Sequence, residues 1–144
     1  MEHQSFQHLT EHLKPVAPRA QVVQGEQWRI SVLTDSLIRI EWSERGIFED
    51  RPTQTVLNRD LGRDVQMTVA HAGANSGVRI ETPALTLDYD GQPLSREGLS
   101  IVVKGVPASQ FNTWHYGDVS RGNLKGTTQT LDEADGDVPL GDGI

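Results

Sequence analysis

The chain has 144 residues, carries 20 acidic against 13 basic side chains for a net charge of -7, and contains no cysteine. An acidic chain without a run of basic residues is a poor partner for nucleic acid or an anionic membrane. The absence of cysteine excludes disulfides, thiolate metal sites and cysteine nucleophiles. A hydrophobic content of only 35% with 14 Gly and 7 Pro favours an all-β fold of short strands, and the length fits one domain.

The amino-terminal stretch predicts an extension to the main domain. Residues 1–14 carry apolar side chains at helical spacing, namely Phe6, Leu9 and Leu13, and Pro15 ends any helix there. We therefore assign residues 1–20 to an extension that contains a short helix. His8 and His12 are four residues apart, but no acidic ligand motif accompanies them, so we expect an exposed helix and no metal site. The stretch has no apolar core of signal-peptide type and no run in the chain approaches membrane-spanning length, so we predict a cytoplasmic protein.

Alternation of apolar and polar residues predicts a series of strands after residue 20. Val22 and Val23 lead into a clear hairpin, in which Trp28, Ile30 and Val32 and then Ile38, Ile40 and Trp42 face the core around a polar break. Four further runs alternate in the same way: Val65, Met67 and Val69; Val78 and Ile80; Leu85, Leu87 and Tyr89; Leu99, Ile101 and Val103. Residues 71–77 are expected to form a flexible turn, and Asp90-Gly91 a tight one. Six or so short strands predict an antiparallel β-sandwich over residues 21–144.

Two polar stretches carry a family resemblance. After the hairpin comes FEDRPTQTVLNRD, residues 48–60, in which Pro52 makes a central strand unlikely to run through. The tail contains Asn-Leu-Lys-Gly-Thr at 123–127 and Thr-Leu-Asp at 130–132, followed by Asp135-Gly136 and Leu-Gly-Asp-Gly at 140–143. Together these resemble the amino-terminal β-sandwich domain of glycoside hydrolase family 31, over about residues 24–144. One departure is Gln129, where the family pattern has arginine.

The resemblance implies a fold and a role. The fold would be the galactose-mutarotase-like antiparallel β-sandwich, truncated at its C-terminal end, because residues 107–144 lose periodicity and the sequence stops at GDGI. The family's two catalytic aspartates come from a (β/α)8 barrel that follows the sandwich, so we assign no catalytic residue and no cofactor to this chain. The parent enzyme would hydrolyse α-glucosides or oligosaccharides with retention, and the partner of the sandwich would be its own barrel. Arg51 and Arg59 are candidate ion-pair partners in that packing.

Three residues are candidate substrate contacts. In the family a loop of the sandwich reaches the sugar pocket, and the matching region is about residues 123–143. Asp132 and Asp135 would accept hydrogen bonds from sugar hydroxyls there, although aspartate before glycine equally caps turns, and both interpretations stay open. Trp114 lies in a cluster with His115 and Tyr116 and is suited to stacking on a sugar, but we favour packing of the loop on the core. The acids of the tail lack the spacing and closing glutamate of a calcium loop.

Two other functions compete with the accessory domain. A freestanding carbohydrate-binding module would need exposed aromatic side chains, and only Trp114 with Tyr116 qualify. A mutarotase-like enzyme would need a histidine and a glutamate on opposite sides of a sugar oxygen. Neither His71 nor His115 has an acid nearby in a convincing strand, so this function ranks last.

Overall fold

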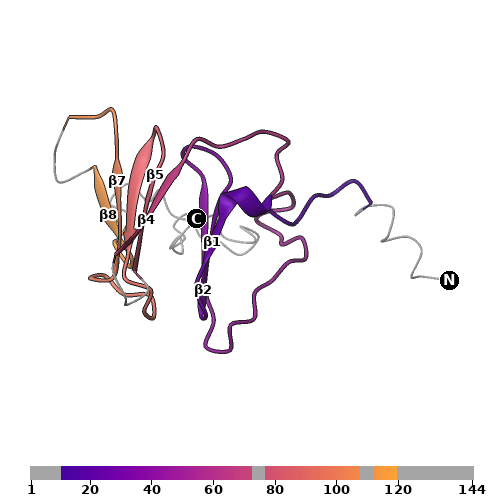
Figure 1. Cartoon of the computed structure of the whole chain (residues 1–144), viewed down its shortest axis with the longest axis horizontal. Helices are drawn as coiled ribbons and strands as arrows, with labels where there is room; N and C mark the ends of the chain where they lie inside the picture. The colour runs from indigo at the N-terminus through magenta and orange to yellow at the C-terminus, as the bar shows by residue number, and fades with distance from the viewer. Residues whose placement is uncertain (1–10, 73–76, 108–111, 120–144) are drawn as a thin grey trace, which may run out of the picture.

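The chain folds into two antiparallel β-sheets, which the computed structural model describes over residues 11–72, 77–107 and 112–119 (Figure 1). After a 3-10 helix η1 (Arg19–Gln21), the smaller sheet has the order β1 (Val22–Gln24), β2 (Trp28–Val32), β3 (Ile38–Trp42). The larger sheet follows in sequential order, with β4 (Thr68–Ala72), β5 (Gly77–Glu81), β6 (Leu85–Tyr89), β7 (Leu99–Val103) and β8 (Thr113–His115). The all-β sandwich predicted from the sequence is confirmed.

The core lies between the two sheets and is built from the alternating apolar residues. In the hairpin, Trp28 pairs with Trp42 and Ile30 with Ile40, as the two matching runs predict. The indole of Trp28 meets the ring of Tyr89 edge-on at 5.6 Å between centroids, which joins β2 to β6 across the sandwich. The buried cluster is completed by residues of both sheets: Ile30, Val32, Val78, Ile80, Leu85, Leu87 and Leu99.

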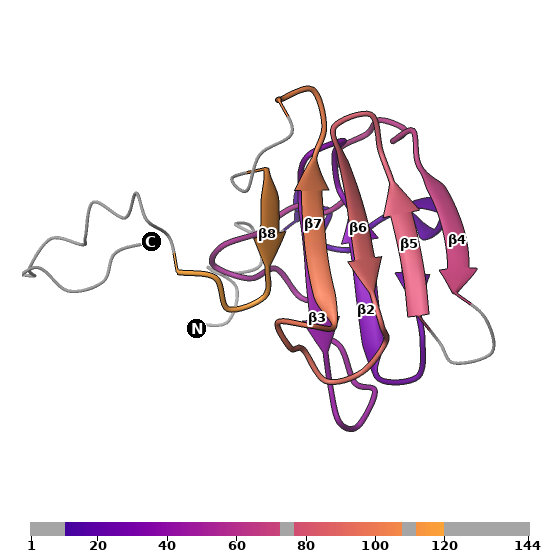
Figure 2. The same ribbon diagram turned by 90° about the vertical axis from the view of Figure 1, so that its left-hand side faces the viewer.

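The smaller sheet does not cover the whole inner face of the larger one. In Figure 2 β2 lies behind β6 and β3 behind β7, so β4 and β8 stand at the margins. Val103 pairs with the buried Leu85 and therefore faces inward, yet it is 45% exposed. Trp114 pairs with Ile101 on the same face and is 40% exposed. Apolar side chains on the inner face thus remain accessible at the β7–β8 margin.

Four sequence-based predictions of secondary structure differ from the structure. The strand expected at Val65–Val69 runs instead from Thr68 to Ala72, so the turn expected at residues 71–77 is too long at both ends. Val65 and Met67 do pack against the core, but from irregular backbone, which explains their alternation. The chain also forms β8, where we expected no strand after Val103, because an edge strand of three residues leaves little periodic signal. Residues 11–14 contain a turn and no helix, and the rest of the expected helix lies outside the described residues.

Candidate functional site

A long segment, residues 43–67, connects β3 to β4 without helix or strand and forms many polar contacts with the smaller sheet. It includes the FEDRPTQTVLNRD stretch. Arg29 projects from the outer face of β2 toward it, donates to the Glu49 carbonyl at 3.1 Å and lies 5.0 Å from the centroid of the Phe48 ring. The segment therefore covers the outer face of the smaller sheet, and we call it the loop layer.

Arg59 holds the loop layer together from inside. Its side chain is only 2% exposed, and its guanidinium donates to the carbonyl oxygens of Glu49 at 2.7 Å and Arg51 at 3.1 Å. Its backbone N–H donates to the Lys14 carbonyl at 2.7 Å, which ties the amino-terminal extension to the same point. Burial and the neighbouring positive charge of Arg39 lower the pKa of Arg59 from its usual value. Residues 48–60, which have the composition of an ordinary polar loop, are thus arranged around the buried guanidinium of Arg59.

Beside Arg59 lies a network of charges on the outer face of β2 and β3. Arg29 donates two hydrogen bonds to the Glu41 carboxylate, of 2.8 and 3.2 Å, and a third to the Asp50 carboxylate at 2.6 Å. Arg39 donates to the same Glu41 carboxylate at 3.0 Å. Burial raises the pKa of Glu41, but the hydrogen bonds from the two arginines outweigh it and bring the pKa below the ordinary value. We call Arg29, Arg39, Arg59, Glu41 and Asp50 the arginine cluster.

The two arginines singled out in the sequence have different surroundings. Arg51 is 85% exposed and pairs with Glu49 at 2.6 Å, not with Asp50, which pairs with Arg29. Arg59 comes no closer than 4.0 Å to a carboxylate, that of Asp50, and bonds to backbone carbonyls instead. Arg51 is therefore accessible to a partner from the surface, whereas Arg59 acts within the domain.

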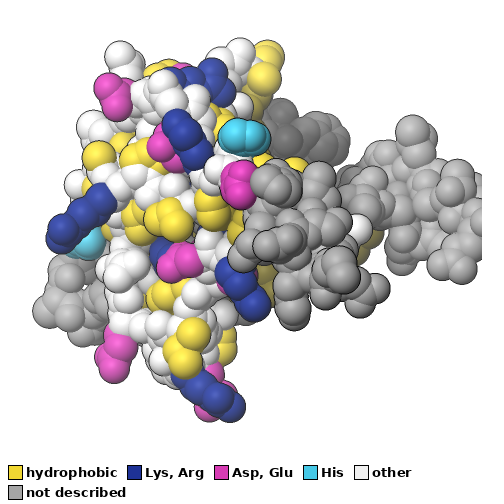
Figure 3. Space-filling view, turned by 90° about the vertical axis from the view of Figure 1, so that its right-hand side faces the viewer, with side chains coloured by type: hydrophobic (Ala, Val, Ile, Leu, Met, Phe, Trp, Pro, Cys, Tyr) yellow, Lys and Arg dark blue, Asp and Glu magenta, His cyan; other side chains and the backbone are white. Residues whose placement is uncertain are grey.

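The outer surface of the loop layer exposes apolar side chains. Ile47, Leu57 and Leu61 are 72%, 50% and 41% exposed, and Val16 of the extension is 59% exposed. The backbone of Lys14 bonds to Asn58, Arg59 and Asp60, which places the extension alongside this part of the loop layer. Figure 3 shows hydrophobic side chains interspersed with charged ones over this side of the molecule. We call Val16, Ile47, Leu57 and Leu61 the apolar surface of the loop layer.

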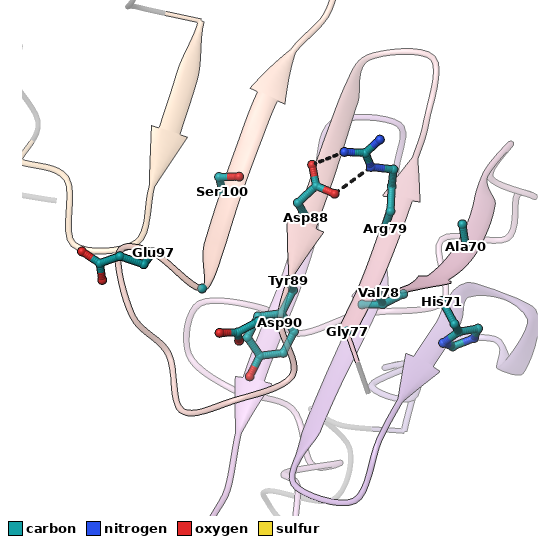
Figure 4. Close-up of a pocket in the computed structure, with 11 residues that line it drawn as sticks. Ala70, His71, Gly77, Val78, Arg79, Asp88, Tyr89, Asp90, Glu97 and Ser100 are labelled. Atoms are coloured by element: carbon teal, nitrogen blue, oxygen red, sulfur yellow. Dashed lines mark hydrogen bonds and ion pairs between the residues drawn. The ribbon is translucent and has the colours of Figure 1, made fainter. Parts of the chain in front are cut away.

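A second candidate site is an open hollow of about 630 Å³ on the larger sheet (Figure 4). Several of the residues that line it are small, including Ala70, Gly77, Gly98 and Ser100. Its polar side chains are largely engaged within the domain. Asp88 forms two hydrogen bonds with Arg79, of 2.7 and 2.9 Å, and Asp90 accepts the Gln92 N–H at 2.9 Å in the turn after β6.

The hollow does not arrange its histidine and glutamate for catalysis. His71 lies on β4, whereas Glu97 lies two residues before the start of β7, and Figure 4 places them at opposite ends of the site. Three strand spacings separate their strands, which amounts to roughly 14 Å. A histidine and glutamate that act on one sugar oxygen must both reach it within hydrogen-bond distance. The mutarotase-like arrangement is therefore not formed here.

Of the three substrate contacts expected from the sequence, only Trp114 lies in the described residues. It stands on β8 beside Tyr116, whose N–H continues the ladder by donating to Leu99 at 3.1 Å, so the two rings share a face; each is 40% exposed. Their exposure leaves both stacking on sugar and packing under a further element open. Asp132 and Asp135 lie outside the described residues.

The turn after β8 is fixed by Asp118. Its carboxylate accepts the His115 N–H at 2.8 Å and pairs with Arg96, and these bonds lower the pKa of Asp118. The imidazole Nδ1 of His115 lies 3.1 Å from the Arg96 carbonyl oxygen. His115 is thereby part of the local hydrogen-bonding, and Asp118, the acid beside it in the described part of the chain, is already paired with Arg96.

Comparison with models of protein families and with curated proteins finds no match. Among the described residues, no group of three or more His, Asp or Glu side chains is arranged to hold a metal ion. In the same residues, no helix has the length and apolar content to cross a membrane. The loop layer, with its buried cation and exposed apolar surface, is the strongest site on which to base a function.

Proposed function

We propose that the chain is a non-catalytic β-sandwich domain of an α-glycosidase resembling family 31, and that it docks on the catalytic barrel through the loop layer. The observation that supports docking is the combination of internal order and external apolar surface in residues 43–67. Long irregular segments in compact domains usually serve a function. This one is fixed by Arg59 from within while Ile47, Leu57 and Leu61 point to solvent.

The energetics favour a partner for this surface. Large apolar side chains that are exposed on one segment lose their contact with water when a partner covers them, which is favourable. Removal of apolar area from water is favourable by about 25 cal/mol per Å² before the costs of association are subtracted, and a preformed surface lowers those costs because it loses little conformational entropy on binding. The buried Arg59 supplies that preorganisation, because its hydrogen bonds to Glu49 and Arg51 fix the backbone below the surface.

Three of the described carboxylates are engaged by arginines within the domain, which fits the proposed non-catalytic role. A retaining glycosidase needs two carboxyl groups about 5 Å apart across the sugar bond, one of them free to protonate the leaving group. Asp88 is paired with Arg79, Glu41 with two arginines and Asp118 with Arg96. In the proposed enzyme the barrel supplies both acids, hydrolyses an α-glucoside with retention in the cytoplasm, and receives Asp132 and Asp135 at its sugar pocket.

The docking proposal is tested by mixing this chain with the separately expressed region that its gene encodes after Ile144. We expect the two to co-elute in size-exclusion chromatography. The double variant L57S/L61S should lose co-elution, whereas V69S, on the opposite sheet, should retain it. Co-elution that survives L57S/L61S, with both variants folded by circular dichroism, would contradict docking through the loop layer.

One observation favours a second function, a freestanding carbohydrate-binding module. Trp114 and Tyr116 share the inner face of the β8 margin and are equally exposed, which is the arrangement that stacks on a sugar ring. Calorimetric titration with maltose and isomaltose tests it. Binding by the chain that disappears in W114A would support the module, and an absence of heat with both sugars would remove it.

A further inference from the structure

Arg39 has unused hydrogen-bonding capacity in the arginine cluster. Among the described residues, its guanidinium bonds to Glu41 alone, through Nη2 at 3.0 Å, and its buried Nε has no partner. The Nε of Arg59, which is also buried, likewise lacks one. The Arg39 side chain is 19% exposed, so the cluster can be reached from solvent on its side.

The charges of the cluster do not balance. Three guanidinium groups face two carboxylates, which leaves one positive charge on a chain whose net charge is -7. Glu41 is already shared between Arg29 and Arg39, and Asp50 lies against Arg29. Buried donors without partners and unbalanced buried charge are each costly, because neither is compensated by water. One further carboxylate placed against the exposed part of the Arg39 side chain would balance the charge of the cluster.

We propose that Arg39, backed by Arg59, receives one carboxylate, contributed by an aspartate or glutamate of the domain that docks on the loop layer. A carboxylate suits the site better than a phosphate, because one charge neutralises the cluster and two oxygens match the planar donors of a guanidinium. The inference rests on the proposed docking for the source of the carboxylate. The site itself is formed by this chain alone and can be tested without a partner.

The test measures the thermal midpoint of the chain while sodium acetate replaces sodium chloride at pH 7 and constant ionic strength. At a tenfold excess of acetate over its dissociation constant, we expect the midpoint to rise by about 3–6 °C. R39Q should abolish the rise. R39K, which keeps the charge but loses the planar donors, should reduce it by more than half. R79Q removes an exposed arginine of the other sheet and should leave the rise unchanged.

A midpoint that does not respond to acetate, or one that rises equally in R39Q and the unmodified chain, would overturn the site. The peptide acetyl-Gly-Glu-Gly-amide, compared with its glutamine counterpart, then distinguishes the sources. A rise with the glutamate peptide supports a protein carboxylate, whereas a rise with acetate alone overturns that source and assigns the site to a small free carboxylate. Either outcome is independent of whether the neighbouring domain is a glycosidase.

Discussion

Replacement of Arg59 by methionine should release the loop layer while leaving both sheets folded. The substitution removes two hydrogen bonds from a charged donor to the Glu49 and Arg51 carbonyls, each worth about 1.5–3 kcal/mol. The substitution also removes the desolvation cost of a buried cation whose nearest carboxylate oxygen is 4.0 Å away, and this offsets part of the lost stability. We expect R59M to lower the free energy of unfolding by about 2–4 kcal/mol, a large part of a typical total of about 5–15 kcal/mol.

Urea unfolding followed by tryptophan fluorescence measures this loss, and hydrogen exchange locates it. Amides of residues 47–60 should exchange faster in R59M, while those of β5 and β6 keep their relative protection. R51M is the matched control, because Arg51 is 85% exposed and its removal should change neither measurement appreciably. If R59M loses less than about 0.5 kcal/mol and its exchange pattern is unaltered, Arg59 does not organise the loop layer.

The charge network, the turns and the sheet margin give three further predictions. The pKa of Glu41 is lower in the folded than in the unfolded chain, so its contribution to stability is complete above its ordinary pKa of 4.5 and disappears as the pH falls through the folded pKa. E41Q should therefore flatten the acid limb of a curve of stability against pH. An unchanged acid limb would contradict this role of Glu41. Gly62 has φ +67° and open space for a methyl group, so Gly62→Ala should lower the free energy of unfolding by about 1–2 kcal/mol. Gly46 has φ +66°, and a methyl group there would lie 2.5 Å from a backbone carbonyl oxygen, so Gly46→Ala should lower the thermal midpoint further than Gly62→Ala does. Equal midpoints for the two variants would count against the close approach. Ile80 is fully buried, so Ile80→Ala should lower the free energy of unfolding in urea by about 2–5 kcal/mol. Val103 is 45% exposed, so Val103→Ala should lower it by less than about 1 kcal/mol. Similar losses for the two variants would show that the β7–β8 margin is covered.

The sequence predicted the sheets well because their cause is local. Alternation at Trp28–Val32 and Ile38–Trp42 places the apolar side chains on one face, and the register of the hairpin follows from that face being buried. The turn at Asp90-Gly91 was equally readable, since Gly91 adopts φ 77°. β4 was displaced because Val65 and Met67 reach the core from irregular backbone, and β8 escaped notice because it is a short edge strand.

The loop layer was not predictable from the same signals. An arginine between asparagine and aspartate in a polar stretch reads as solvent-exposed, and nothing local indicates that Arg59 is almost fully buried. Its partners are backbone carbonyls eight and ten residues away and the extension at Lys14, so the arrangement depends on long-range closure of the chain. The resemblance drew attention to the stretch and suggested ion pairs of Arg51 and Arg59 with a following barrel, which stay a prediction; what the sequence did not indicate is that Arg59 bonds to backbone carbonyls within the domain.

The proposed role as an accessory domain is tested most directly by reading the gene past the codon for Ile144. We expect the frame to continue into further strands and then into repeated β–α units with an aspartate at the end of a strand, as a catalytic (β/α)8 barrel requires. A stop codon directly after Ile144 would contradict the account, because no barrel would then be joined to the loop layer.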